Sequence, residues 1–282
     1  RSLDSRKIEM AAAKVVIKKV NGKSRVTRCL SKYPLKFIIP TKVCSSEIDV
    51  VWVYVATYGG GIVAGDSISS EITVEDGCTA VITTQASTKV YKSLEGKYSD
   101  QSLEAKVGSE GLLVVIPDPV TCFSTARYEQ KQVFHVSPDA NVVIVDWITS
   151  GRHESGEKWD FNRYKSSNQI FTNDGHPLFL DSVLLEAGAV SSIAERMHHY
   201  QVIGMLIMYG TKLARILSEI EAKVREMYNA KSKPCIVVSS SRFGLDLGVV
   251  VRFASINAEL VYNLLRQLLR GLESFVGVRP YE

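Results

Sequence analysis

The segment Thr57-Tyr-Gly-Gly-Gly-Ile-Val-Ala-Gly-Asp66 is followed directly by Ser67-Ile-Ser-Ser-Glu-Ile-Thr-Val74, and this junction decides the fold class. Before it, residues 50–57 are β-branched or aromatic almost throughout, which is typical of a strand buried on both faces. After it, residues 68–74 alternate between apolar and polar side chains with the period of two that a strand requires. The glycines are therefore predicted to form a tight connection between two strands.

The same glycines allow a competing interpretation. Gly59, Gly61 and Ala64 match the spacing of the dinucleotide-binding fingerprint, and a strand candidate precedes them. That fingerprint works only when a helix follows, because the helix N-terminus faces the pyrophosphate. A cofactor-binding enzyme that uses the turn from Gly59 to Asp66 is therefore the alternative, and a helix that begins near Gly61 is what it requires.

Further strand candidates recur about every ten to twelve residues, which is the rhythm of a sandwich or other stacked-sheet fold. The chain opens with a predicted hairpin, because Asn21-Gly22 separates two β-branched runs. The periodicity changes in the last third, where apolar residues three or four apart predict a helix over 200–228. A second helix is predicted to begin near Ser255 or Asn257, both of which are good N-cap residues. The chain is thus expected to be mainly β, with two α-helices in the C-terminal third.

Composition narrows the class of protein. The 282 residues include 34 basic and 30 acidic side chains, and no run of five or more basic residues occurs, so nucleic-acid binding is not expected. The five cysteines form no C-x-x-C pair, and their odd number argues against a complete disulfide framework. The apolar runs fall short of the ~18 residues that cross a bilayer, and the first residues lack the apolar core of a signal peptide. We expect a cytoplasmic protein without a membrane partner.

Asp146 is the most unusual polar residue, because it lies within the apolar run 142–148, where an unpaired carboxylate is costly. It requires a hydrogen-bond donor, a metal or a water-filled cavity, and an ion pair with the nearby Arg152 is the simplest structural explanation. Asp66 follows Gly65, and an aspartate in that position most often hydrogen-bonds its own turn. Neither H-x-H, H-E-x-x-H nor G-x-S-x-G occurs, so the sequence predicts no tight metal site and no catalytic residues.

Four segments carry a resemblance to a known family. They are Tyr58-Gly-Gly-Gly-Ile-Val-Ala-Gly-Asp66, Thr83-Thr-Gln-Ala-Ser-Thr-Lys-Val-Tyr-Lys-Ser93, Leu113-Val-Val-Ile-Pro-Asp-Pro119 with Phe123-Ser-Thr-Ala-Arg127, and Val145-Asp-Trp-Ile-Thr-Ser-Gly-Arg152. Their order and spacing resemble the family of urease accessory protein D, called H in some bacteria, and its eukaryotic, plant-like branch in particular. Lys92 departs from the family pattern, which has arginine before the serine.

The resemblance implies a single domain over residues 1–282, with disorder expected within about the first ten. It implies stacked β-sheets in a helical, β-helix-like arrangement with the two helices packed on them. It also implies a non-catalytic scaffold, a metallochaperone for nickel insertion during urease maturation. Members of the family bind the helical accessory protein F, which recruits the GTPase accessory protein G, and they dock apo-urease.

Nickel is thought to travel through a tunnel in this subunit, so the resemblance implies nickel in transit and no tightly bound cofactor. The positions in this chain that match transient nickel positions are Asp66, Asp146 and Glu186, and Thr84, Ser87 and Thr88 form the accompanying polar cluster. Carboxylates suit a hydrated divalent cation, and the scarcity of His and Cys clusters suits conduction, because tight ligation traps the ion. A β-rich interaction protein without metal handling is a further alternative.

Overall fold

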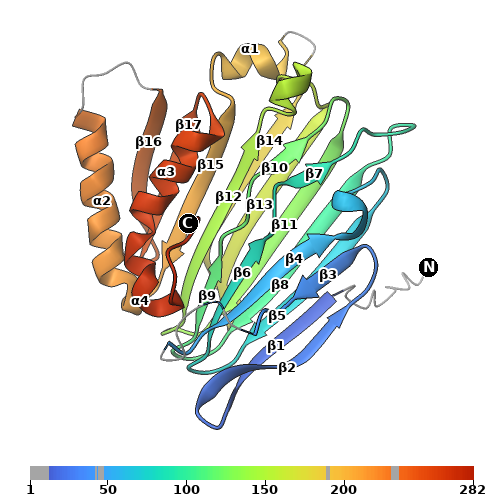
Figure 1. Cartoon of the computed structure of the whole chain (residues 1–282). Coiled ribbons are helices and arrows are strands. Elements are labelled where there is room, and N and C mark those ends of the chain that lie inside the picture. Colours follow the sequence, from blue (N-terminus) through green and yellow to red (C-terminus); the bar gives the residue numbers. More distant parts are fainter. Residues whose placement is uncertain (1–12, 42, 44–47, 189–190, 230–234) are drawn as a thin grey trace, which may run out of the picture.

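The computed structural model describes residues 13–41, 43, 48–188, 191–229 and 235–282, so the disorder expected near the N-terminus lies outside the described residues. The described residues form two β-sheets that lie face to face, and helices cover part of the outer face of the second sheet (Figure 1). No helix in these ranges combines the length and the apolar character needed to cross a membrane.

Both sheets contain mixed strand directions. In spatial order the first sheet consists of β14 (Pro177–Glu186), β13 (Arg163–Thr172), β11 (Arg127–Val136), β8 (Ser99–Val107), β5 (Ser67–Val74), β1 (Ala13–Val20) and β2 (Lys23–Ser31). The second consists of β16 (Ile236–Phe243), β17 (Gly248–Ser255), β15 (Val202–Tyr209), β12 (Asn141–Thr149), β9 (Leu112–Val115), β6 (Thr79–Thr84), β4 (Val51–Thr57) and β3 (Leu35–Ile38). Two short strands extend it, β10 (Val120–Cys122) beside β12 and β7 (Thr88–Val90) beside β10.

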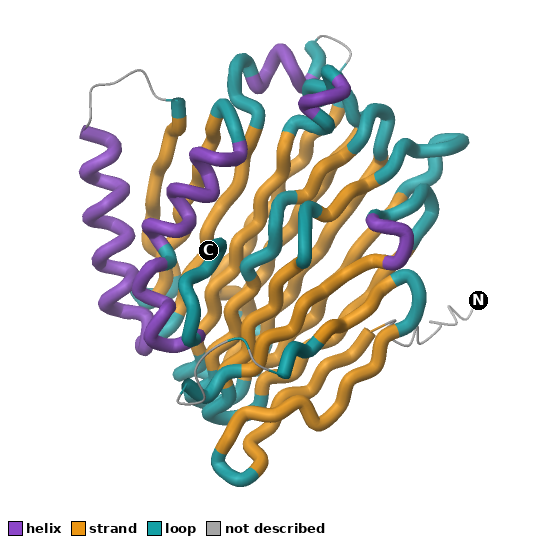
Figure 2. Tube along the Cα trace, viewed as in Figure 1, coloured by secondary structure: helices purple, strands orange, loops and turns teal. Residues whose placement is uncertain are grey.

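The central part of the chain coils between the two sheets. From β4 to β13 it passes repeatedly from one sheet to the other, so that β5, β8, β11 and β13 are parallel neighbours in the first sheet. In the second sheet β4, β6, β9 and β12 are parallel neighbours in the same way. The tube in Figure 2 shows these strands side by side. The predicted stacked, β-helix-like arrangement is therefore confirmed.

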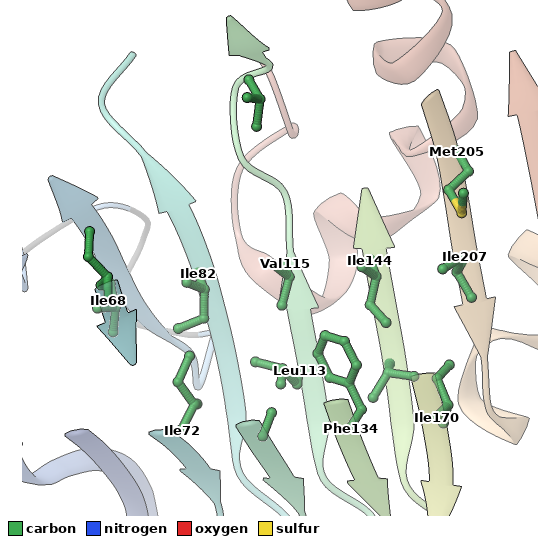
Figure 3. Close-up of a cluster of buried hydrophobic side chains, with 14 of the residues drawn as sticks. Ile68, Ile72, Ile82, Leu113, Val115, Phe134, Ile144, Ile170, Met205 and Ile207 are labelled. Atoms are coloured by element: carbon green, nitrogen blue, oxygen red, sulfur yellow. The ribbon is translucent and has the colours of Figure 1, made fainter. Parts of the chain in front are cut away.

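The first hydrophobic core lies between the two sheets. Ile68 and Ile72 of β5 point inward at alternate positions, as the period-two pattern requires, and meet residues such as Ile82 and Leu113 of the second sheet (Figure 3). Full burial of each such side chain contributes about 1.5–3 kcal/mol. This core fixes the separation of the sheets and hence the space available between them.

A second core joins the second sheet to the helices. It packs β12, β15 and β17 against α2 (Ala214–Asn229), α3 (Ala258–Leu268) and α4 (Glu273–Val276), while the short α1 (Ile193–Met197) lies before β15. Single turns of 3-10 helix occur at Tyr58–Gly60, His153–Ser155, Thr211–Leu213 and Arg270–Leu272. Strand β12 is buried on both faces, which explains the apolar run around Asp146.

Two local predictions are confirmed. The opening hairpin pairs β1 with β2, and both of its turn residues, Asn21 and Gly22, have positive φ angles of 51° and 77°. Helix α3 begins after Asn257, whose side chain accepts a hydrogen bond from the backbone N–H of Leu260 at 3.0 Å.

The helix predicted over 200–228 is wrong in its first third. Residues Val202–Tyr209 form strand β15, and α2 begins only at Ala214. The strand is apolar on both faces because it lies between two strands and between the two cores, so the three-or-four spacing found there was accidental. Gly210, with a φ of 127°, separates the strand from the helical segment. Strands β13 and β14 were not predicted.

Candidate functional site: a polar hollow between the sheets

The Asp146 carboxylate bridges the two sheets. It projects from β12 toward the first sheet and is 6% exposed. Its Oδ1 accepts a hydrogen bond from Gln130 Nε2 at 2.6 Å, and its Oδ2 accepts from Ser166 Oγ at 2.5 Å and from Asn168 Nδ2 at 2.6 Å. Gln130 and Ser166 are register partners on the adjacent strands β11 and β13. The parallel coil thus brings three donors to one carboxylate.

Burial raises the pKa of Asp146 above its ordinary value, because the surroundings solvate the charge less well than water does. The hydrogen bonds from Ser166, Asn168 and Gln130 act in the opposite direction without cancelling the effect of burial. The nearby Asp181 on β14 adds like-charge repulsion. The site therefore holds a carboxylate whose negative charge is only partly compensated.

The raised pKa of Asp146 predicts a pH dependence of stability. In the unfolded chain the pKa of this carboxyl is near its ordinary value of about 4. At a pH between this pKa and the raised pKa of the folded state, the folded protein binds more protons than the unfolded chain does. The free energy of unfolding of wild type, relative to Asp146→Asn, is therefore expected to rise as the pH falls from neutral toward about 4. Denaturant unfolding of both proteins across this interval measures the difference, and a constant difference contradicts the expectation.

Asp146 also forms part of the wall of a cavity of about 100 Å³ between the sheets. The lining combines apolar residues with neutral oxygen and nitrogen donors and acceptors and with three charged residues, Asp118, Lys131 and Asp146. The polar lining residues include Ser70, Gln101, Gln130 and Gln132 on the first sheet and Thr83, Thr84 and Thr88 on the second. Because one water molecule occupies about 30 Å³ in the liquid, the cavity has room for more than one.

A second hollow, of about 160 Å³, adjoins the first. The two share Val55, Thr84, Thr88 and Gln101 in their walls. Ser87 lines the second hollow only. Of the residues singled out in the sequence, the structure therefore brings Asp146, Thr84, Thr88 and Ser87 to one continuous polar region.

Asp66 and Glu186 lie elsewhere. The Asp66 Oδ2 accepts a hydrogen bond from the backbone N–H of Val63 at 2.8 Å, so the side chain closes its own turn, and it is absent from the walls of both hollows. Glu186, at the end of β14, forms an ion pair with Arg163 at 2.9 Å and has a side chain that is 46% exposed. The structure does not bring either residue to Asp146.

The ion pair suggested between Asp146 and Arg152 is wrong. Arg152 pairs instead with Glu157, and its guanidinium lies 4.1 Å above the centre of the Phe123 ring. The chain leaves the second sheet after Thr149, where β12 ends, and this carries Arg152 away from the inward face on which Asp146 lies.

The glycine-rich segment is a connection between strands. After the turn Tyr58–Gly60 the chain is extended at Gly61, and β5 begins at Ser67, so the helix that a dinucleotide site requires is replaced by a strand. A Cβ at Gly61 would lie 2.7 Å from the carbonyl oxygen of Lys89, which explains why this position needs glycine. The enzyme alternative therefore loses the structural element on which it depended.

The Asp118 loop forms another part of the cavity wall. The Asp118 Oδ1 accepts a hydrogen bond from the hydroxyl of Tyr262 on α3 at 2.6 Å, and its Oδ2 accepts from Thr84 Oγ1 at 3.3 Å. The neighbouring carbonyl of Pro117 accepts from Tyr281 Oη at 2.8 Å and from Trp147 Nε1 at 2.9 Å. The helical layer and the cavity wall are thus joined through this loop.

Sequence reasoning missed Gln130, Ser166, Asn168 and Asp118. The sequence did contain a signal for Gln130. Gln130 and Gln132 lie on the inward face of β11 between two buried aromatic residues, Tyr128 and Phe134, where apolar side chains are expected. Within the described ranges, no three His, Cys, Asp or Glu side chains are grouped as a metal site. The oxygen atoms in the hollow come mainly from amides and hydroxyls, which bind cations weakly.

The fold and the site define a two-sheet β protein with an internal polar hollow, and the comparison with known proteins places it in a family. Residues 9–282 match the family model described as UreD urease accessory protein, and the chain belongs to that family. It is 55% identical to urease accessory protein D of Arabidopsis thaliana over 96% of this chain and 100% of the relative. The corresponding protein of Oryza sativa subsp. indica is 49% identical, over 96% and 95%.

A bacterial relative is more distant. Urease accessory protein UreD of Sorangium cellulosum is 36% identical over 96% of this chain and 83% of the relative. The higher identity to the two plant proteins supports the placement of this chain in the plant-like branch of the family.

Proposed function

We propose that this chain acts in urease maturation as a non-catalytic cytoplasmic scaffold and metallochaperone, and that nickel crosses its β core on the way to apo-urease. Family membership and the names of the relatives, which are urease accessory proteins, support the role in maturation. The observation that carries the nickel route is the buried Asp146 carboxylate in the wall of a hollow large enough for water.

The chemistry of the hollow suits a cation in transit. A partly compensated carboxylate attracts a divalent cation, because the cation supplies the solvation that burial removed. Neutral amide and hydroxyl oxygens, such as those of Gln101, Thr84 and Thr88, replace part of the hydration shell without holding the ion tightly. Conduction requires this balance, since a site that binds too strongly does not release the ion.

The proposed partners are urease accessory protein F, the GTPase accessory protein G through F, and apo-urease. We propose that the C-terminal helices form part of the surface for protein F, and the structure of the helical layer supports this. Between α2 and the segment from α3 to the C-terminus lies an open cleft of about 850 Å³, lined by charged residues that include Arg215, Glu219, Arg270, Glu273 and Arg279. Such a surface is suited to a polar protein interface.

Coexpression tests the nickel route. Urease and accessory proteins F and G are produced with wild type, Asp146→Asn, Asp66→Asn or Glu186→Gln, and the nickel content and activity of the purified urease are measured. Asp146→Asn removes the charge but keeps the size of the side chain, so we expect a several-fold loss of nickel with the accessory complex still assembled.

The other two variants locate the route. Asp66 and Glu186 lie outside both hollows, so their variants are expected to resemble wild type if the hollow alone carries nickel. A loss with Asp66→Asn as large as that with Asp146→Asn would place the route along the turn instead. Full nickel loading by Asp146→Asn would favour an interaction scaffold without metal handling.

A further inference from the structure

We infer that Asp118 is a second carboxylate along the cation route and that Tyr262 of α3 controls its availability. The inference rests on the proposed function, because it assigns a role in the same hollow. It is carried by a different set of contacts, which join the cavity wall to the helical layer.

Asp118 and Asp146 line the same cavity but differ in their surroundings. Asp146 is buried and accepts three hydrogen bonds, whereas Asp118 is half-buried and its carboxylate accepts from Tyr262 and Thr84. Both of these partners are neutral hydroxyls. Among the residues that the structure describes, no cation forms an ion pair with Asp118, so its charge is available to a cation that enters the cavity.

The backbone around Asp118 is held in place. The Asp118 N–H donates to Thr84 Oγ1 at 2.9 Å, and Pro117 and Pro119 flank the residue and restrict its backbone angles. The remaining freedom belongs to the side chain. The carboxylate accepts two hydrogen bonds, from Tyr262 at 2.6 Å on Oδ1 and from Thr84 at 3.3 Å on Oδ2, and the shorter one, from Tyr262, holds it more firmly.

Tyr262 connects this carboxylate to the outer helices. Its ring packs edge-on against Trp147, with 4.9 Å between the ring centres, and its centre lies 5.7 Å from that of the Tyr281 ring. Tyr281 is next to the last residue, and the C-terminus lies beside α3 (Figure 1). Burial and the bond to Asp118 raise the pKa of Tyr262, so the hydroxyl stays protonated and remains a donor at neutral pH. The position of α3 thus sets the orientation of a carboxylate in the cavity wall.

Tyr262 and Tyr281 provide a matched pair of variants. Each donates one hydrogen bond to the same loop, Tyr262 to the Asp118 carboxylate and Tyr281 to the neutral carbonyl of Pro117. Tyr262→Phe removes the shorter of the two hydrogen bonds to the carboxylate, whereas Tyr281→Phe removes a bond of similar length and leaves both bonds to the carboxylate in place. A merely structural role for these tyrosines predicts the same effect from both.

The experiment is a titration of the full chain, in its complex with protein F, with Ni²⁺ in competition with a chromogenic chelator. We expect Tyr262→Phe to tighten nickel binding by between about twofold and tenfold, the range that corresponds to one hydrogen bond. Asp118→Asn is expected to weaken binding, and Asp118→Asn combined with Tyr262→Phe to show no gain over Asp118→Asn alone. Tyr281→Phe should bind nickel as wild type does.

The outcomes separate this inference from the proposed function. Unchanged binding by Asp118→Asn together with weaker binding by Asp146→Asn overturns the role of Asp118 and leaves the nickel route intact. Unchanged binding by both variants overturns both proposals. Denaturant unfolding checks each variant, and if Asp118→Asn fails to fold, the tyrosine pair decides alone, because equal nickel affinity of Tyr262→Phe and Tyr281→Phe contradicts the inference.

Discussion

Replacement of Asp146 by alanine is expected to lower the free energy of unfolding by about 3 kcal/mol at neutral pH. The variant leaves three buried donors, on Gln130, Ser166 and Asn168, without their acceptor, and each unsatisfied buried group costs about 1–3 kcal/mol. The sum is reduced because the space left by the carboxylate adjoins the cavity, where water can enter.

The matched control for this effect is Asp146→Asn. Asparagine keeps an acceptor oxygen and the volume of the side chain and removes a charge that burial disfavours, so it is not expected to lose more than about 1 kcal/mol. Urea unfolding of wild type and the two variants measures the difference. Equal stability of Asp146→Ala and Asp146→Asn would show that the three donors do not depend on this carboxylate.

A still larger loss of stability, of about 3 kcal/mol or more, is expected from Gly204→Val in β15. A Cβ at Gly204 would lie 2.4 Å from Trp147 Cβ, 2.7 Å from the carbonyl oxygen of Asp146 and 2.8 Å from the Phe253 ring. Two of these atoms belong to the strand that carries Asp146, so the larger side chain must push β12 and β15 apart in a packed core.

The control for Gly204→Val is Ser241→Val, which introduces the same valine side chain at an exposed position on β16 of the same sheet. The control is expected to stay within about 0.5 kcal/mol of wild type, as surface substitutions usually do. Urea unfolding distinguishes the two. A Gly204→Val protein as stable as Ser241→Val would mean that β15 does not pack against Trp147 as described.

The elements that were predictable from the sequence are those fixed by local chemistry. Asn21-Gly22 specifies its turn by its tolerance of positive φ, and Asn257 specifies a helix start by its side-chain acceptor. The strand after the glycines was predictable because the alternation in Ser67–Val74 reports which side chains face the core.

The elements that were not predictable depend on distant contacts. Strand β15 is apolar on both faces because it lies between two strands and two cores, and such a run is compatible with a buried helix as well as a strand. The inward face of strand β13 is polar in its middle, because Ser166 and Asn168 serve Asp146, and only Tyr164 and Ile170 on that face join the hydrophobic core. The apolar alternation expected of a half-buried strand is therefore interrupted at Ser166 and Asn168.

In the candidate site, too, local features were predictable from the sequence and distant contacts were not. The apolar neighbours of Asp146 in the sequence showed that its carboxylate needs a hydrogen-bond partner. They did not show which residues the partners are, because Gln130, Ser166 and Asn168 lie 16, 20 and 22 residues away and approach Asp146 only when the chain coils between the sheets. Arg152 is close in sequence yet is paired with Glu157. Proximity along the chain was therefore a poor guide to proximity in space.

The central claim, that nickel crosses between the two sheets, is tested most directly by blocking the hollow without changing its charge. Thr88 lines both hollows, so Thr88→Trp fills the region where they meet, while Thr27→Trp places the same bulk on the exposed face of β2. The measurement is the nickel content of urease matured with each variant. We predict nickel-poor, inactive urease with Thr88→Trp and normal urease with Thr27→Trp. Fully nickel-loaded urease from a folded Thr88→Trp protein, assembled with its partners, would contradict the claim.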